Sequence, residues 1–182
     1  MRHIKIIRSI SLIIATFLIT SCSNNSAMKP EDFKNKEPRL IIEEYLTGNV
    51  KAWGVLQNRS GKVTRQFSAD LDGTWDGKQL ILKEKFNWDD GEVQNRKWII
   101  NKIDENNYEG TAGDVVGKAK GYSYGPAFKF EYVLLVPVKG REMKITFDDW
   151  IFKQDERVAI NRATMTKFGI KVAELTVVFI KD

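Results

Sequence analysis

Cysteine and histidine are almost absent from this sequence of 182 residues, in which Cys22 and His3 are the single representatives of their types. A chain with one cysteine can form no intramolecular disulfide, so its stability must come from burial and hydrogen bonding. Both residues lie near the amino terminus. If that segment is cleaved or modified, the remaining chain lacks the imidazole and the free thiol on which Ser-His-Asp catalysis, Cys-His catalysis and most zinc sites depend.

The amino terminus also lacks an apolar run long enough for a permanent membrane span, which needs about 20 residues. A basic start at residues 2–8 leads into the apolar stretch 10–19, and the small residues Thr20 and Ser21 follow. This order is typical of an export signal. We therefore predict that residues 1–21 form a signal peptide and that they are removed.

The segment Ile19-Thr20-Ser21-Cys22 resembles the lipobox of bacterial lipoproteins. The resemblance implies cleavage before Cys22, acylation of Cys22, and attachment to a membrane through this residue. Two or three acyl chains anchor a protein stably, since each buried CH₂ contributes about 0.8 kcal/mol. Ser23 resembles the outer-membrane address of enteric lipoproteins, so we expect a place in the bacterial cell envelope, at the outer membrane and facing the periplasm. The alternative is an ordinary secretory signal followed by a free cysteine.

A concentrated basic region is missing as well. The formal net charge of +5 includes three basic residues of the predicted signal, and it falls to +2 when they are removed. Nucleic-acid binding requires a clustered basic face. The sequence therefore argues against a nucleic-acid partner, and the segment that is predicted to be lost accounts for most of the basic character.

The remaining chain fits one domain with a substantial core. Residues 22–36 are polar and predict a flexible tether that carries the lipidated cysteine. Residues 37–182 predict the folded domain, which begins with a short helix or turn at Pro38–Leu46. Ten β-strands are expected after it, at 50–56, 63–71, 79–88, 94–103, 108–112, 117–122, 127–138, 142–153, 158–166 and 171–180.

Turn signals such as Asp72-Gly73 and Asp90-Gly91 separate most of these runs, and Asp-Gly between alternating runs favours a hairpin. No connection is long enough for a helical crossover, so the sheet should be antiparallel. Short, evenly spaced strands suggest a sandwich or a barrel. Because the hairpins follow one another directly, we predict an all-β fold: a single antiparallel up-and-down barrel, similar to the calycins and lipocalins, preceded by a short helix.

Alternate side chains of a barrel strand face the interior. On this basis five charged side chains share a face with apolar residues on their strands: Arg65, Glu84, Arg96, Asp149 and Arg162. A buried charge must be paired or must meet a polar ligand, because an unpaired one is very costly. Two acids and three arginines leave a surplus of positive charge, and arginine suits a carboxylate or phosphate.

These residues lead to a functional hypothesis, with a structural alternative beside it. In the first, the barrel holds an amphipathic ligand whose acidic head meets the arginines and whose tail meets aromatic residues such as Trp88, Trp98 and Trp150. In the second, the charges only form ion pairs that fix the strand register. A strand bulge would shift a face by one residue and change some of these assignments.

An enzyme is the less favoured reading. A glycosidase needs two convergent carboxyl groups, and the candidate pairs Asp89 with Asp90 and Asp148 with Asp149 are neighbours in the chain that would point to opposite faces. The glycine-rich region 113–125 lacks the strand-to-helix context of a phosphate loop. We expect no catalytic residues, no metal and no cofactor.

Several strings in the mature chain together resemble one protein family. They include Trp53-Gly54-Val55, Leu82-Lys83-Glu84-Lys85-Phe86, Arg96-Lys97-Trp98, Phe147-Asp148-Asp149-Trp150 and Asn161-Arg162-Ala163-Thr164-Met165. The family is a proteobacterial envelope lipoprotein family catalogued as domain of unknown function thirty-eight thirty-three. The resemblance implies a lipoprotein without an established activity, and a weak link to modified fatty acids.

The sequence thus predicts a lipid-anchored, monomeric barrel that binds a small amphipathic ligand, with an acyl lipid as the favoured class. The alternative is a packed barrel that binds a protein partner on its outer face. Val133 and Leu135, which alternation places on the outside, are the best sequence indication of such a face.

Overall fold

The computed structural model describes residues 27–138 and 140–182, so the predicted signal peptide and Cys22 lie outside the described residues. The described chain forms two short helices followed by ten strands. They are η1 (Pro30–Phe33), α2 (Ile42–Tyr45), β1 (Gly48–Asn58), β2 (Val63–Trp75), β3 (Gln79–Trp88), β4 (Val93–Lys102), β5 (Asn107–Thr111), β6 (Ala119–Tyr124), β7 (Ala127–Val138), β8 (Arg141–Lys153), β9 (Val158–Lys167) and β10 (Ile170–Lys181).

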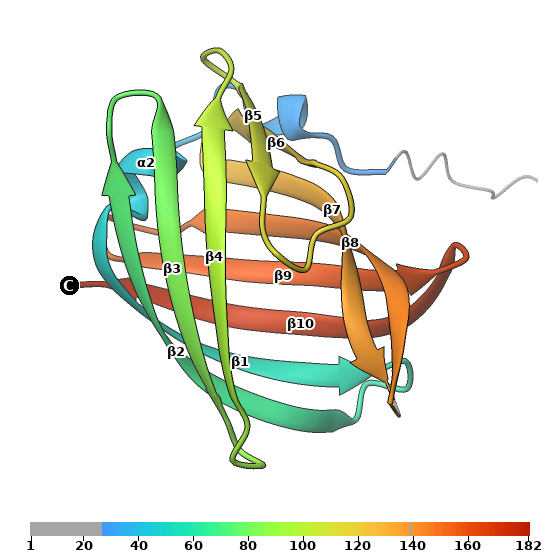
Figure 1. The fold of residues 1–182 in the computed structure, drawn as a ribbon. Helices are drawn as coiled ribbons and strands as arrows, with labels where there is room; N and C mark the ends of the chain where they lie inside the picture. The colour runs from blue at the N-terminus through green and yellow to red at the C-terminus, as the bar shows by residue number, and fades with distance from the viewer. Residues whose placement is uncertain (1–26, 139) are drawn as a thin grey trace, which may run out of the picture.

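The ten strands form one closed barrel (Figure 1). Each strand pairs antiparallel with the next in the sequence, and β10 returns to pair with β1 from Val50–Lys181 to Asn58–Ala173. Closure satisfies the backbone groups of the first and last strands, which would otherwise be open edges. The predicted all-β, antiparallel up-and-down barrel is therefore confirmed, and each predicted strand has its counterpart.

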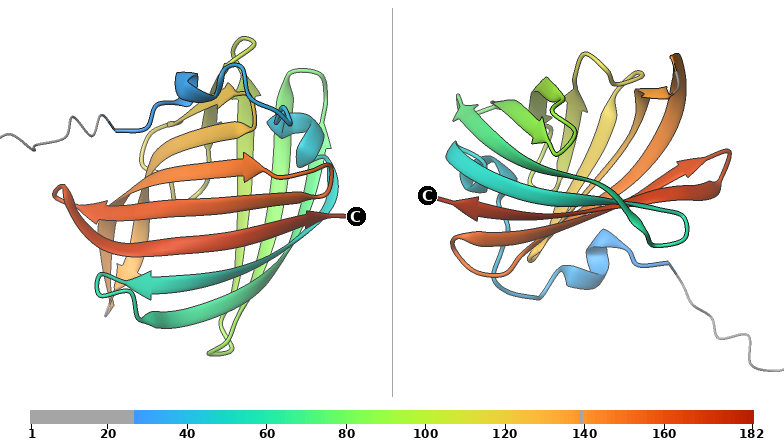
Figure 2. Two further views of the ribbon diagram at one scale, coloured as in Figure 1. Left: turned by 180° about the vertical axis from the view of Figure 1, so that it is seen from behind. Right: turned by 90° about the horizontal axis from the view of Figure 1, so that it is seen from below.

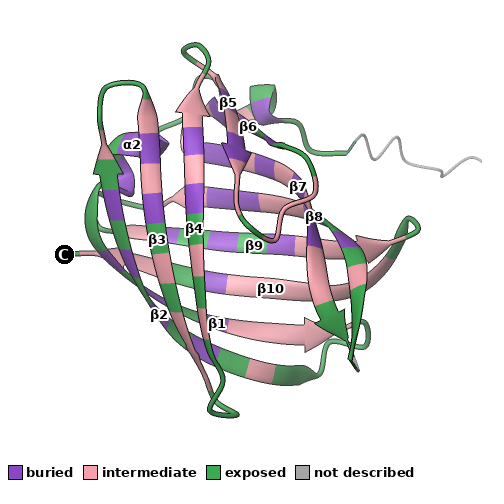
Figure 3. Ribbon diagram, in the orientation of Figure 1, coloured by how far each residue is buried: buried purple, intermediate pink, exposed green. Residues whose placement is uncertain are grey.

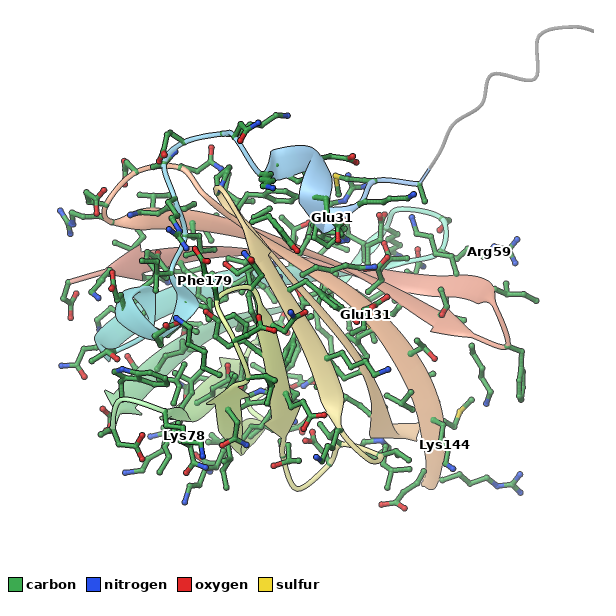
Figure 4. The ribbon with its side chains drawn as sticks, turned by 90° about the horizontal axis from the view of Figure 1, so that it is seen from above. Glu31, Arg59, Lys78, Glu131, Lys144 and Phe179 are labelled. Carbon is green, nitrogen blue, oxygen red and sulfur yellow. The ribbon has the colours of Figure 1, made fainter. Side chains whose placement is uncertain are left out.

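Up-and-down connectivity puts the hairpins β1–β2, β3–β4, β7–β8 and β9–β10 at one end of the barrel, here called the hairpin end. Glycines such as Gly61 and Gly91 take positive φ values of 83° and 87° at these turns, a conformation that other residues adopt only at a cost. Figure 4 shows Arg59 and Lys144 at this end, with Lys78 and Phe179 toward the opposite end. Phe168 is 93% exposed at the β9–β10 tip.

The segment 40–46, which contains α2, covers the other end of the barrel, here called the closed end (Figure 2). The apolar residues Leu40, Ile42, Tyr45 and Leu46 are buried there. A Cβ at Gly73 would lie 1.8 Å from the Leu46 carbonyl oxygen, so only glycine lets β2 approach this segment so closely.

The helix α2 is shorter than the predicted range Pro38–Leu46, because the backbone of Leu40 forms hydrogen bonds elsewhere. The Leu40 N–H donates to the Gly125 carbonyl at 2.8 Å, and its carbonyl accepts from the Ser123 hydroxyl at 2.9 Å. The backbone of Leu40 is therefore occupied by the β6–β7 hairpin and cannot join a helix.

Part of the predicted tether packs against the barrel. The Phe33 ring of η1 lies 6.0 Å from the Trp150 ring and 5.5 Å from the Phe152 ring, between centroids, and Pro30 is buried. Residues 30–33 of the predicted tether thus form a short helix that lies against the barrel. Within the part of the chain that the structure describes, no helix is long and apolar enough to cross a membrane.

Burial alternates along the strands, as a barrel requires (Figure 3). The pattern is regular in the first half of β3, where Leu80 and Leu82 are buried. The short strands β5 and β6 leave a gap in the wall between β4 and β7 near the hairpin end. Residues 112–118 fill it, because the Val116 N–H donates to the Val133 carbonyl and the Leu135 N–H donates to the Asp114 carbonyl.

Candidate functional site

A cavity of about 290 Å³ occupies the barrel interior. Ile42 and Leu46 line it at the closed end, and Arg65, Trp88 and Glu92 line it toward the hairpin end. Most of the lining between them is apolar or aromatic, with contributions from Phe67, Leu82, Phe86, Trp98, Phe128, Phe130, Phe147 and Phe179. The interior is thus an apolar space with polar groups at a few defined positions.

Glu84 and Arg96 lie side by side on the cavity wall. They are directly opposite each other in the β3–β4 pairing, which fixes their proximity from the strand register. The Arg96 Nη1 to Glu84 Oε2 distance is 3.9 Å, close enough for electrostatic attraction but too long for a hydrogen bond. Both side chains face the interior, as the alternation of the sequence predicted.

Arg96 makes its short contacts with Asp114 instead. Its Nε and Nη2 donate to Asp114 Oδ2 at 3.0 and 2.8 Å. Asp114 belongs to the segment 112–118, so this pair fastens the segment to β4 while the backbone bonds fasten it to β7. Asp114 was not among the predicted site residues, because no local pattern shows which distant strand a loop carboxylate will meet.

Asp149 is the second predicted acid that faces the cavity, and its oxygens are fully engaged. The Tyr132 hydroxyl donates to Oδ2 at 2.9 Å, and the Asn161 amide donates to Oδ1. Asn161 also donates to the Trp150 carbonyl at 3.1 Å. Neither Tyr132 nor Asn161 was selected from the sequence, although both line the cavity.

Burial controls the protonation of the two acids. It raises the pKa of Glu84 to about 7; Arg96 opposes the rise, while Asp149 and Asp114 add to it. Burial likewise raises the pKa of Asp149 to about 6, against the hydrogen bonds from Asn161 and Tyr132. Both carboxyl groups therefore titrate close to neutral pH, which is common for groups at functional sites.

Several polar atoms around the cavity have no partner. Glu84 Oε2 and Asp114 Oδ1 are buried acceptors without a hydrogen bond, and Trp88 Nε1 and Arg65 Nε are buried donors without one. Buried polar groups are nearly always paired in native proteins. These four atoms all belong to residues that line the one cavity.

The predicted tryptophans Trp88 and Trp98 are cavity residues. Trp98 packs against Phe130 and Tyr132, with ring centroids 5.0 and 5.3 Å apart. The Arg65 guanidinium lies 4.0 Å above the Trp88 ring and pairs with Asp90 and Glu92 at 2.8 Å. Arg65 thus belongs to the hairpin end of the cavity, and its charge is already balanced.

Two predicted site residues are on the outside. Arg162 is exposed and pairs with Glu174 at 2.8 Å, and Trp150 packs under Phe33. The inward face of β9 is Ala159, Asn161 and Ala163, all buried. The prediction put Arg162 inside because it shares a face with apolar residues of its strand, but the inward residues of β9 are small or polar instead. Trp150 follows the inward Asp149 and therefore points outward.

The predicted surplus of positive charge is also wrong. The acidic and basic residues that line the cavity are Arg65, Glu84, Glu92, Arg96, Asp114 and Asp149, which makes two guanidinium groups against four carboxyl groups. Arg65 is taken by Asp90 and Glu92. Among the residues that the structure describes, no three acids, histidines or cysteines are grouped so that they could hold a metal ion.

Comparisons with known proteins agree with the fold. The profile of the family described as "Protein of unknown function (DUF3833)" matches residues 16–181. The S-type phycobiliprotein lyase CPES from Guillardia theta has a similar structure, with a TM-score of 0.59 and 10% identity over 86% of this chain and 98% of that one.

A protein of unknown function from the DUF3598 family of Nostoc punctiforme is similar over 81% of this chain and 51% of that one, with a TM-score of 0.58 and 13% identity. No curated protein matches the sequence. At these identities the structural likeness shows a shared calycin-like barrel and nothing about the ligand.

Proposed function

The chain belongs to the DUF3833 family, and from its geometry we propose that its barrel binds one small amphipathic molecule, with an acyl chain as the apolar part. The observation that carries the proposal is a single cavity with an apolar lining and a few polar groups, several of them unpartnered. Ligand sites typically have this composition and volumes of about 300–1,000 Å³. The cavity volume of about 290 Å³ is near the lower limit, which suits a ligand with one acyl chain rather than two.

A small residue on the cavity wall supports a binding role rather than a purely structural one. Protein interiors normally pack to a density of about 0.74 and leave few voids larger than a water molecule. Ala52 lines the cavity here, and its methyl group leaves space that a larger side chain could fill. We propose no catalytic role for the carboxyl groups around this space.

The proposed place of action is the bacterial cell envelope. Cys22, in its lipobox-like sequence, would carry the acyl chains, and Ser23 would direct the protein to the outer membrane, where the barrel would act as a monomer facing the periplasm. Growth of the host with an alkyne-labelled fatty acid tests the anchor. Full-length protein should take up the label and the Cys22→Ser variant should not, and equal labelling of the two would refute it.

Native mass spectrometry tests the cavity. A soluble form that begins at Ser23 keeps every residue that the structure describes, and it should carry a stoichiometric small molecule when purified without detergent. The Ala52→Phe variant, which fills part of the cavity with a ring, should lose that molecule, whereas Arg162→Ala, a change on the outer face, should retain it. An empty wild-type protein, or a folded Ala52→Phe variant that still carries the molecule, would contradict the proposal.

A second candidate function is binding of a protein partner, and an exposed apolar row on the outer wall favours it. Trp53 on β1 is 49% exposed and lies opposite Val178 of β10, which lies opposite Ile160 of β9; both of these are also exposed. Val133 and Leu135, the positions expected from the sequence, are instead only partly exposed beside the segment 112–118.

Cross-linking separates the two candidates. A photoreactive residue at Ile160 should capture a partner if the outer row is the functional surface, and Trp53→Ser should then abolish that capture without changing what the cavity holds. If Trp53→Ser has no effect on any cross-link, the outer row is not a specific interface.

A further inference from the structure

The charge balance inside the barrel restricts the polar head of the ligand, and this inference rests on the proposed function. Arg96 is the one cation in a group of lining residues that also holds three carboxyl groups, those of Glu84, Asp114 and Asp149. It donates two of its N–H groups to Asp114. A ligand carboxylate at this position would join three carboxyl groups. Placing like charges together in a site costs several kcal/mol.

The unpartnered atoms specify the complementary chemistry. Glu84 Oε2 and Asp114 Oδ1 are both acceptors, both are buried, and both belong to residues that contact Arg96. Asp149 differs, because Tyr132 and Asn161 already donate to its two oxygens. The cluster therefore lacks hydrogen-bond donors, whereas the unpartnered donors, Trp88 Nε1 and Arg65 Nε, belong to the hairpin end of the cavity.

We propose that the cavity of this protein selects an amphipathic ligand whose head is a protonated amine, with its N–H groups donating to Glu84 and Asp114. An ammonium group offers three donors and one positive charge, which meets two acceptors and offsets the excess of carboxylates. Charge-assisted hydrogen bonds of this kind are about twice as strong as neutral ones. The apolar chain then lies among Trp98, Phe130 and Phe147.

The test compares three probes with one alkyl chain length: dodecylamine, dodecanol and dodecanoate. Titration calorimetry of the soluble form, at a pH about one unit above the pKa of about 7 of Glu84, gives the affinities. Dodecylamine should bind at least about tenfold more tightly than dodecanol, since a hydrogen bond to a charged group contributes more than a neutral one. Dodecanoate should bind most weakly.

Glu84→Gln identifies the residue responsible. It keeps the size of the side chain and removes its charge, so it should reduce the preference for dodecylamine over dodecanol by about tenfold. Binding of dodecanol, which needs only the apolar cavity, reports that the variant is folded. Asp70→Asn, on the exposed outer face of β2, removes the same charge outside the barrel and should change nothing. If Glu84→Gln does not fold, Asp114→Asn is read in the same way.

The outcomes separate the two proposals. Dodecanoate binding as tightly as dodecylamine, or an amine preference that survives Glu84→Gln, would overturn the amine head and leave the binding cavity in place. Failure of all three probes to bind with one-to-one stoichiometry would overturn the proposed function, and the amine head with it.

Discussion

Two buried glutamates of this barrel have opposite surroundings. Glu43 of α2, at the closed end, has a side chain that is 5% exposed; it accepts from Lys102 Nζ at 2.5 Å and from the Tyr108 hydroxyl at 2.9 Å. Glu84 on the cavity wall is 12% exposed, and its nearest cation, Arg96, is 3.9 Å away. Both carboxyl groups lie inside the same fold, so the difference between them comes from their partners.

Their protonation follows from those partners. Burial raises the pKa of Glu43, but the hydrogen bonds from Lys102 and Tyr108 bring it below its ordinary value. Burial raises the pKa of Glu84 to about 7, and Arg96 opposes this only in part. A carboxylate that the fold uses for stability is satisfied within the fold. Glu84 differs, because its Oε2 has no hydrogen-bond donor although it lies beside the cavity, and a ligand is the better explanation for such a group.

The largest effect on stability is expected from Glu43→Ala. The change leaves the Lys102 ammonium and the Tyr108 hydroxyl without their acceptor at the closed end, and breaking a buried pair in this way costs about 4 kcal/mol. Urea unfolding measures it. Glu44→Ala, a change at the exposed neighbour on the same helix, should cost less than about 0.5 kcal/mol. Similar losses in the two variants would show that Glu43 has no special structural role.

The pH dependence of stability should distinguish the effects of Glu84 and Glu43 most directly, because their pKa values shift in opposite directions. The pKa of Glu84 is raised in the folded state, so the folded protein binds more protons than the unfolded chain between the ordinary value of 4.5 and about 7. Stability therefore falls as the pH rises through this window, by up to about 3 kcal/mol from this group. The charged and titratable groups that face Glu84 are Arg96, Asp114 and Asp149.

Glu84→Gln should flatten that part of the profile, leaving the smaller slope that Asp149, with its pKa of about 6, contributes. Urea unfolding across the window measures both proteins. Glu43 changes the stability with pH in the opposite direction, because its pKa is lowered in the folded state. Its contribution to stability is lost as the pH falls below 4.5. A wild-type protein whose stability does not fall between these pH values would contradict the unsatisfied state of Glu84.

Arg96→Met should have an intermediate effect that depends on pH. It removes the cation between Glu84, Asp114 and Asp149, but Glu84 and Asp149 can take up protons in response, which limits the loss to about 2 kcal/mol. The loss should shrink as the pH is lowered below about 6, where both groups are protonated. A loss that is constant with pH would mean that Arg96 acts through packing alone.

The sequence predicted most of the fold and half of this cluster, for reasons that individual strands make clear. On β3 and β4 the large residues Leu82, Phe86 and Trp98 mark the inward face, so Glu84 and Arg96 were assigned correctly. On β9 the inward residues Ala159, Asn161 and Ala163 are small or polar, so hydrophobicity indicates the wrong side.

The residues that were missed depend on contacts between distant parts of the chain. Asp114 reaches Arg96 from a loop, and Tyr132 and Asn161 meet Asp149 from β7 and β9. A period-two pattern reports on which side of one strand a residue lies. It carries no information about which loop covers a gap in the wall, so the partners of a correctly assigned charge remain unknown until the strands are placed together.

The smallest effect is expected at Arg162, and it tests whether the polar cluster ends at the barrel wall. Arg162→Ala removes an exposed ion pair with Glu174, which contributes about 0–1 kcal/mol, and it should leave ligand binding unchanged. Asn161→Ala, one residue earlier, removes a donor to Asp149 inside the barrel and should cost about 1–3 kcal/mol. Urea unfolding of the two variants, with native mass spectra of each, makes the comparison. Because the two residues are neighbours in the chain and differ only in the face of β9 from which they project, a larger loss for Arg162→Ala would mean that the inward side of this strand had been assigned incorrectly.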